Sequence, residues 1–312
     1  MRKIALTLSL LGACTAELRG GHDAAPRAEA SASPVDATVA DRTVVPPVRD
    51  LAAPPRDLGV PVDAAPPCTK DCVPMVWIPA GTFLMGATNV PGESRPQHAV
   101  TLSRGFWLDK YEVSQKRYKR CLDEGACAKP EGSFDGATER AVYGIPWSVA
   151  EAYCRWAGKR LPTEAEWERA GCGDGVRCYP WGGQKQGGSD CTDKPDCAKA
   201  AHCLKSQCAG GACYNTPQDV GQFEAAGNRS AFGVVNLAGN VWEWVQDIWT
   251  PDFSWCTSGC VDPLPKGSSS QHVMKGGSWV SEEVFLRCAA RYHDGAGGFP
   301  TIEVGIRCAR SP

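Results

Sequence analysis

The sequence predicts an α+β fold with little regular secondary structure, cross-linked by disulfide bonds. Its 312 residues include 34 Gly and 24 Pro, which interrupt helices and strands. Its 17 Cys follow a leader typical of exported proteins, and disulfides persist in oxidising compartments. Short segments with helix-capping patterns alternate with short apolar segments, so both helices and strands are expected.

The charge and hydropathy patterns argue against two classes of protein. The net charge is −2 without a basic block, whereas nucleic-acid binding needs clustered Lys and Arg. No apolar run reaches the roughly 18 residues that a transmembrane helix requires. We therefore expect neither a nucleic-acid partner nor a membrane-spanning helix.

Residues 1–13 are typical of a lipoprotein signal peptide. Arg2 and Lys3 precede a short apolar stretch. The segment Leu11-Gly12-Ala13-Cys14 resembles the lipobox of bacterial lipoproteins, which implies cleavage before Cys14 and lipidation of its thiol. An ordinary signal peptide cut nearby is the alternative. We expect an exported protein of the cell envelope, lipid-anchored at the outer membrane or in the periplasm.

The segment that follows, residues 14–67, has the composition of a tether. It is rich in Pro and Ala, lacks aromatic residues and shows no helical or strand period. Such a segment cannot bury enough apolar surface to offset the entropy of ordering it. We expect a disordered spacer that ends where the folded domain, residues 68–312, begins.

Within that domain, short segments carry the signals of regular structure. Two apolar segments are typical of strands, and three segments begin with a Ser or Thr that is typical of a helix start. The predicted strands are Met75–Pro79 and Val100–Leu108. The predicted helices are Ser114–Leu122, Ser148–Gly158 and Thr163–Gly171, with capping boxes of Ser148 with Glu151 and of Thr163 with Glu166. In the second helix, Val149, Ala152, Tyr153 and Trp156 are spaced as one buried stripe.

Seven sequence blocks occur in a fixed order over residues 73–310. They are Trp77-Ile-Pro-Ala-Gly-Thr-Phe-Leu-Met-Gly86, Lys159-Arg-Leu-Pro-Thr-Glu-Ala-Glu-Trp-Glu168, Tyr179-Pro-Trp-Gly182, Asn236-Leu-Ala-Gly-Asn-Val-Trp-Glu-Trp244, Lys275-Gly-Gly-Ser-Trp279, Arg287-Cys-Ala-Ala-Arg291 and Gly305-Ile-Arg-Cys308. In this order they resemble the formylglycine-generating enzyme family, also called sulfatase-modifying factors. The resemblance implies an α+β fold related to C-type lectins. It supports the fold more strongly than the function, because one scaffold hosts many kinds of site.

The copper-binding cysteines of that family are missing here. In active members, two Cys shortly after the Lys-Gly-Gly-Ser block bind copper(I), and oxygen converts a Cys within Cys-x-Pro-x-Arg to formylglycine. Residues 279–287 contain no Cys. The first ligand position falls on Ser281, and the second falls where this chain is shorter. A hydroxyl cannot replace a thiolate on copper(I), so we do not expect copper.

The resemblance also implies a structural calcium ion. Asn236, Gly239, Val241 and Glu243 match positions that bind calcium in the family. Calcium takes six to eight oxygen ligands, and this set offers two side chains and two backbone carbonyls. The alternative is a glycine turn whose Asn and Glu bond to the backbone.

Family resemblance further implies two long-range disulfides. It pairs Cys154 with Cys308, and Cys172, shifted by about one position, with Cys288. Neighbouring cysteines look like local disulfides, namely Cys68 with Cys72, Cys121 with Cys127 and Cys256 with Cys260. The cysteines between 178 and 213 are not assigned to partners. A zinc site is the less favoured alternative, because Cys-x-x-Cys pairs are lacking there.

By resemblance, the family's substrate cleft is bordered by Trp242, Ser278, Trp279, Ser281 and Arg291. An Arg beside aromatic rings suits anionic or peptide ligands, although the same residues are equally compatible with core packing. We predict a lipid-anchored envelope protein that does not oxidise cysteine and binds a peptide, glycan or protein partner. The alternative is a formylglycine-generating oxidase acting on a sulfatase Cys.

Overall fold

The computed structural model describes most of the predicted domain. The described residues are 70–87, 96–175, 177–184, 191–203, 214–256, 259–294 and 301–312. Within these ranges, no helix combines the length and apolar character that a membrane span requires. The predicted signal peptide, Cys14 and the tether lie outside the described residues.

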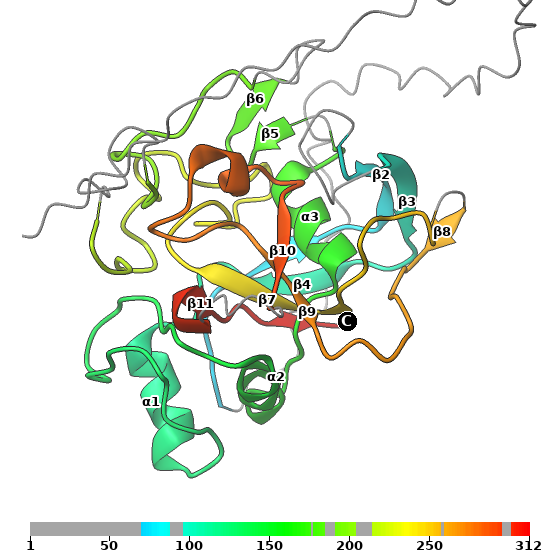
Figure 1. Cartoon of the computed structure of the whole chain (residues 1–312). Helices are drawn as coiled ribbons and strands as arrows, with labels where there is room; N and C mark the ends of the chain where they lie inside the picture. The colour runs from blue at the N-terminus through cyan, green and yellow to red at the C-terminus, as the bar shows by residue number, and fades with distance from the viewer. Residues whose placement is uncertain are drawn as a thin grey trace, which may run out of the picture. The chain divides into compact units, whose positions relative to one another are not determined.

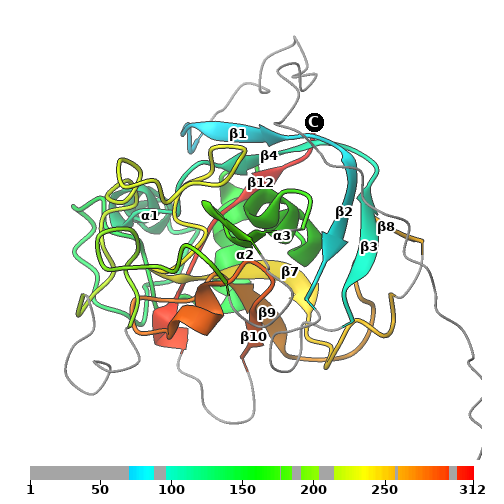
Figure 2. The same cartoon turned by 90° about the horizontal axis from the view of Figure 1, so that it is seen from above.

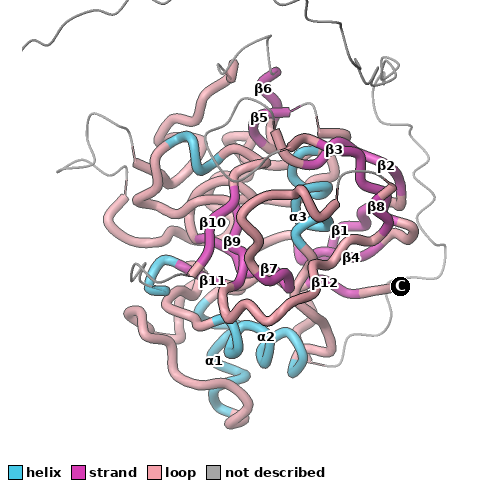
Figure 3. Tube along the Cα trace, turned by 45° about the vertical axis from the view of Figure 1, so that its right-hand side comes forward, coloured by secondary structure: helices cyan, strands magenta, loops and turns pink. Residues whose placement is uncertain are grey.

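Short helices and strands are separated by long loops throughout this part of the chain (Figure 1, Figure 3). The helices are α1 (Gln115–Asp123), α2 (Trp147–Trp156) and α3 (Glu164–Cys172), with 3₁₀ turns η1 (Glu283–Leu286) and η2 (Thr301–Glu303). The first strands are β1 (Met75–Ile78), β2 (Gly81–Met85), β3 (His98–Leu102), β4 (Phe106–Asp109), β5 (Arg177–Tyr179) and β6 (Gly182–Gln184). The later strands are β7 (Trp242–Ile248), β8 (Cys260–Val261), β9 (His272–Lys275), β10 (Arg291–His293), β11 (Val304–Gly305) and β12 (Ala309–Arg310). The predicted α+β class is confirmed.

The strands form small sheets rather than one large sheet. Their orders are β1-β4-β12, β10-β9-β7-β11 and β2-β3-β8, and β5 pairs with β6. Most pairs are antiparallel, whereas β11 runs parallel to β7 and β8 runs parallel to β3. The β11–β7 pair brings a C-terminal segment beside the Asn236–Trp244 block.

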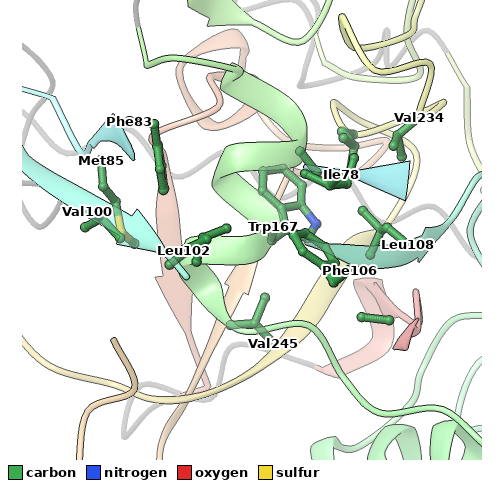
Figure 4. Close-up of a cluster of buried hydrophobic side chains, with 14 of the residues drawn as sticks. Ile78, Phe83, Met85, Val100, Leu102, Phe106, Leu108, Trp167, Val234 and Val245 are labelled. Atoms are coloured by element: carbon green, nitrogen blue, oxygen red, sulfur yellow. The ribbon is translucent and has the colours of Figure 1, made fainter. Parts of the chain in front are cut away.

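Helix α3 lies among these sheets and organises the core. It contacts β2, β3, β5, β7 and β9, and Figure 2 shows it between the β4–β12 pair and β7. Its Trp167 is fully buried amid Ile78, Leu102 and Phe106 (Figure 4). Burying one such aliphatic or aromatic side chain contributes about 1.5–3 kcal/mol, so this cluster holds the sheets together.

Charged side chains of the β10-β9-β7 sheet also bind α3. Lys275 of β9 is opposite both Glu243 of β7 and Arg291 of β10. Lys275 Nζ lies 2.9 Å from Glu168 Oε2, and the Arg291 guanidinium donates to both oxygens of Glu164 at 2.9 Å. This side of the sheet is therefore joined to α3 by buried ion pairs.

The helix starts are predicted correctly in two cases and wrongly in one. The Ser114 side chain caps α1, and the capping box of Thr163 and Glu166 opens α3. Helix α2 instead follows Pro146, which cannot cap through a side chain, and Ser148 lies inside the helix. Its buried residues include Ala150, Tyr153 and Cys154, so the buried stripe is rotated from the predicted one.

The predicted strand Val100–Leu108 is in fact two strands, β3 and β4, in different sheets. The chain turns at residues 103–105, where the Ser103 N–H donates to Asp262 Oδ1 at 2.8 Å. A Cβ on Gly105 would lie 2.2 Å from the Trp77 ring. Only glycine lets the turn pass so close to β1, and hydrophobicity alone does not reveal that requirement.

Disulfides cross-link the domain over both long and short chain distances. The Cys154–Cys308 bond that the resemblance implies is present and spans 154 positions. The local bonds Cys121–Cys127 and Cys256–Cys260 are present as well, and Cys178 pairs with Cys191. Cys72, Cys197 and Cys203 are also disulfide-bonded. Cys68, Cys208 and Cys213 lie outside the described residues.

The predicted pairing of Cys172 with Cys288 is wrong: both are buried thiols rather than halves of one disulfide. Cys172 is the last residue of α3, and Gly171 precedes it. A Cβ on Gly171 would lie 3.8 Å from Cys288 Sγ, so the Cys288 thiol faces the side of α3 that Gly171 occupies. One residue along a helix is a rotation of about 100°, so side chains at positions 171 and 172 leave the helix in different directions.

Candidate functional site

Two serines and one glutamate converge at the position that the resemblance assigns to copper. Ser278 Oγ donates to Glu303 Oε2 at 2.5 Å, and Ser281 Oγ lies 3.1 Å from Ser278 Oγ. The Ser281 hydroxyl also accepts a hydrogen bond from the Ser278 N–H at 2.9 Å. We call Ser278, Ser281 and Glu303 the Ser–Glu cluster.

The two glycines before Ser278 position the cluster. Gly276 and Gly277 have φ of +96° and +77°, a region that L side chains rarely adopt. A Cβ on Gly277 would lie 2.9 Å from Leu286 Cδ1. The Gly-Gly-Ser block therefore turns the chain tightly at the end of β9 and delivers Ser278 to the cluster.

Glu303 reaches the cluster from the other side, through the β11–β7 pair. It ends η2 and directly precedes β11. Its side chain is half-buried, and burial raises the pKa of this carboxyl, although the donated Ser278 hydrogen bond opposes the shift. On the flanks, Val280 is 41% exposed and Ile302 is 43% exposed. The cluster thus combines hydroxyls, one carboxyl group and neighbouring exposed aliphatic side chains.

Glu303 is the member of this site that the sequence did not suggest. The available signal was an acidic residue immediately before Val304 and the Gly305-Ile-Arg-Cys308 block. Nothing local distinguishes that carboxyl from an ordinary surface charge. Its partner Ser278 is 25 positions away, so tertiary structure alone brings the two together.

The donor atoms of the Ser–Glu cluster do not fit copper(I). Copper(I) prefers soft sulfur ligands, whereas hydroxyl and carboxylate oxygens are hard donors. The two thiols that are candidates for such a site, Cys172 and Cys288, are buried at α3. Among the described residues, no three His, Cys, Asp or Glu side chains gather as a metal-binding group.

Three residues predicted for the cleft are buried instead of lining a surface. Trp242 packs against the rings of Phe285 and Tyr292, and Trp279 meets Tyr143 edge-on. The Arg291 guanidinium pairs with Glu164 and lies 4.4 Å from the Trp249 ring centroid. In this structure these residues pack the interior. Ser278 and Ser281 of the predicted set are buried as well, at 0% and 8% exposed, so Glu303 is the partly exposed member of the cluster.

The residues predicted for calcium lie in a buried polar network. Arg307 Nη2 donates to Glu243 Oε1 at 2.7 Å, and Trp167 Nε1 donates to Glu243 Oε2 at 2.6 Å. Both partners of the ion pair are at most 1% exposed. The carboxylate of Glu243 is thereby neutralised and hydrogen-bonded without a metal ion.

Asn236 belongs to the same network through Glu112. The Asn236 and Asn240 amides donate to the Glu112 carboxyl at 3.1 and 2.9 Å. Burial raises the pKa of Glu112 to about 8, with the nearby Arg307 charge lowering it and Glu243 raising it. Asn236 Oδ1 is buried and has no hydrogen-bond partner.

This arrangement does not fit a calcium site built on Asn236, Gly239, Val241 and Glu243. The Asn236 Oδ1 atom is available, but the charged ligand Glu243 is committed to Arg307. Gly239 has φ +82°, and a Cβ there would lie 2.3 Å from the Ala201 carbonyl oxygen, so the glycine is required by packing alone. Calcium binding stays a prediction of the resemblance.

Comparisons with known proteins agree with the fold and its blocks. A family model described as "Sulfatase-modifying factor enzyme 1-like domain" matches residues 62–312. Formylglycine-generating enzyme of Mus musculus is 30% identical over 293 residues, covering 75% of this chain and 74% of that protein. Serine/threonine-protein kinase pkn1 of Chlamydia caviae is 30% identical over 259 residues, covering 76% of this chain and 38% of that protein. The solved structure of PvdO from Pseudomonas aeruginosa matches with a TM-score of 0.61 and 23% identity over 79% of this chain and 98% of that chain, a likeness of fold alone.

Proposed function

Because the chain belongs to the sulfatase-modifying factor enzyme 1-like family, we propose that it is a binding member of that family. In this proposal it does not oxidise cysteine by the copper route, and it holds a peptide or protein partner at the Ser–Glu cluster. The proposal includes export and lipid anchoring through Cys14, which would place the domain at the cell envelope.

One observation carries the proposal: the Ser281 hydroxyl stands at the first position where the family's chemistry requires a thiolate, and the second position has no counterpart in this chain. Ser281 Oγ is engaged with Ser278, and Ser278 is engaged with Glu303. A hydroxyl has a far higher pKa than a thiol and offers copper(I) no soft, anionic ligand. Without such ligands, metal affinity is lost, and with it the family's route for activating oxygen.

The surroundings of the cluster suit a polypeptide ligand better than a sugar. Val280 and Ile302, which neighbour Ser281 and Glu303 in the sequence, expose aliphatic surface, and aliphatic contacts with a few fixed polar groups are typical of peptide recognition. The half-buried Glu303 carboxyl can accept a hydrogen bond from a backbone N–H or a basic side chain. A glycan would more often meet exposed aromatic rings, and Trp242 and Trp279 are buried.

A formylglycine-generating oxidase is the second candidate function. The identity with the mouse enzyme favours it, because that protein bears this activity in its name. It would require sulfur ligands that reach a target cysteine at the surface. The buried Cys172 and Cys288 offer such ligands only if the region around α3 rearranges.

A turnover assay separates the two functions. The full-length protein, supplied with copper(I) and oxygen, is incubated with a Cys-x-Pro-x-Arg peptide, and aldehyde formation is followed by mass spectrometry. An active relative that retains both copper cysteines serves as the positive control. We expect no aldehyde from this chain, and peptide oxidation above the copper-only background would contradict the proposal.

Anchoring is tested separately in cells. Metabolic labelling with an alkyne fatty acid should modify the wild-type protein and leave Cys14→Ser unlabelled and released from membranes. An unlabelled wild-type protein would favour an ordinary signal peptide.

A further inference from the structure

We propose a second binding site, distinct from the Ser–Glu cluster, that accepts an arginine or lysine side chain of a partner polypeptide. It is a cavity of about 570 Å³, within the size range of small-ligand sites. Its lining shares no residue with the Ser–Glu cluster. The lining residues that carry the argument are Val73, Pro74, Tyr111, Glu139, Asp219 and Val220.

The cavity walls come from distant segments that are fixed to one another by backbone hydrogen bonds. The Lys110 N–H donates to the Pro74 carbonyl at 2.9 Å, and the Val220 N–H donates to the Glu139 carbonyl at 3.0 Å. Cys72, next to Val73, is held by a disulfide. The cavity is therefore formed before a ligand arrives, which lowers the entropic cost of binding.

The charges around the cavity are mostly paired, and one carboxylate is left over. Arg117, which also lines the cavity, is neutralised by Asp71 and Asp109, and Glu139 lies 3.2 Å from Lys116 Nζ. Asp219 is exposed and forms no ion pair with a described cation, and Arg140 is its backbone partner in an isolated β-bridge. The lining therefore carries an excess of negative charge, which is complementary to a basic group.

The aromatic wall favours a cation with an aliphatic stem. The Tyr111 hydroxyl donates to Glu224 at 2.5 Å, which holds the ring in place. Lys110 Nζ lies 5.1 Å from the ring centroid and 2.7 Å from Glu224 Oε1, so its charge is neutralised within the protein. The stem of an Arg or Lys can pack on Val73, Pro74 and Val220 while its head reaches Asp219.

A pair of peptides that differ only in charge tests the site. Acetyl-Pro-Arg-Pro-amide and its citrulline analogue are titrated into the full-length protein, and affinities are measured by calorimetry. We expect the arginine peptide to bind about two- to fivefold more tightly, the range of a solvent-exposed ion pair. The difference should shrink as salt is raised.

Two variants and one control locate the interaction. Asp219→Asn should abolish the preference for arginine, whereas Glu151→Gln, the same charge change on α2 outside the lining, should preserve it. Gly221→Leu should block both peptides, because a Cβ there would lie 3.8 Å from the Tyr111 ring without backbone strain and a longer side chain would fill the cavity. Unchanged thermal unfolding of each variant shows that its fold is intact.

Two results would overturn the assignment. One is equal affinity for the two peptides in the wild-type protein. The other is an arginine preference that survives Asp219→Asn and Gly221→Leu. Neither depends on what the Ser–Glu cluster does, so this site and the proposed function fail independently.

Discussion

Ser281 shows how much a single residue determines in this protein. It stands at the predicted position of a copper-binding cysteine, and its hydroxyl is committed to Ser278. The sequence alone shows that Ser281 stands in place of a cysteine, and residue type alone decides whether its side chain can bind copper(I). The contact between Glu303 and Ser278 cannot be predicted from the sequence, since the parallel pairing of β11 with β7 brings Glu303 to Ser278. The burial of Arg291 likewise cannot be predicted from the sequence, because it depends on the ion pair with Glu164 of α3.

Glu243 provides the residue-scale test of the calcium prediction. Glu243→Gln leaves the Arg307 guanidinium buried without its charge partner, and breaking a buried ion pair in this way costs about 3–5 kcal/mol. We expect the same fall in melting temperature in calcium chloride and in a chelator. A wild-type melting temperature that rises with calcium, with no such rise in Glu243→Gln, would restore the calcium assignment.

The raised pKa of Glu112 leads us to expect that the free energy of unfolding depends on pH. Its pKa in the folded state is about 8, above the ordinary 4.5, so the folded protein binds a proton that the unfolded chain lacks between those values. The free energy of unfolding should therefore decrease as pH rises from about 4.5 to about 8. Glu112→Gln, which mimics the protonated carboxyl, should flatten this part of the profile in urea unfolding. A variant with the wild-type slope would assign the dependence to other groups.

At the scale of elements, local sequence patterns predict the first residue of a helix correctly where a side chain caps it. They fail where the backbone conformation sets the helix start. Thr163 and Glu166 form both hydrogen bonds of the expected capping box. Ser148 and Glu151 have the same spacing, yet Pro146 sets the start of α2 and Glu151 pairs with Arg155. A capping pattern therefore needs a compatible chain entering the helix, which the motif alone does not contain.

The two helices supply a matched pair of variants. Thr163→Ala should lower the free energy of unfolding by about 1 kcal/mol, because it removes the cap of α3. Ser148→Ala should change it by less than about 0.5 kcal/mol, because Ser148 caps nothing. Chemical denaturation of both variants checks the prediction. Equal effects would mean that the α3 box does not contribute as described.

At the scale of the whole molecule, ordered sequence blocks predict the fold better than periodicity does. The blocks place Trp167, Trp242, Gly276 and Gly277 in the interior, where packing and positive φ require those residue types. The hydrophobic pattern predicts one strand where β3 and β4 are separate, because it does not contain the turn at Gly105 beside Trp77. Neither the sequence blocks nor the hydrophobic pattern predicts the cavity at Tyr111, since segments far apart in the sequence form it.

Removing a long-range and a short-range disulfide shows how much each cross-link stabilises the whole domain. The Cys154–Cys308 bond closes a loop of 154 positions, whereas Cys256–Cys260 spans 4. In the chain-entropy model these bonds contribute about 5 and about 2 kcal/mol. Cys154→Ser should therefore lower the melting temperature more than Cys256→Ser, with alkylation mapping to Cys308. Alkylation elsewhere, or the reverse order of stability, would contradict this account of the cross-links.

The central claim is that the Ser–Glu cluster offers no ligand for copper(I), and an anaerobic copper(I) competition measures this directly. The full-length protein is titrated into a chromogenic copper(I)–chelator complex, beside an active relative with both copper cysteines. We expect the relative to remove copper from the chelator and this chain to leave the absorbance unchanged. Uptake of one copper(I) per chain, lost on Ser281→Ala, would contradict it.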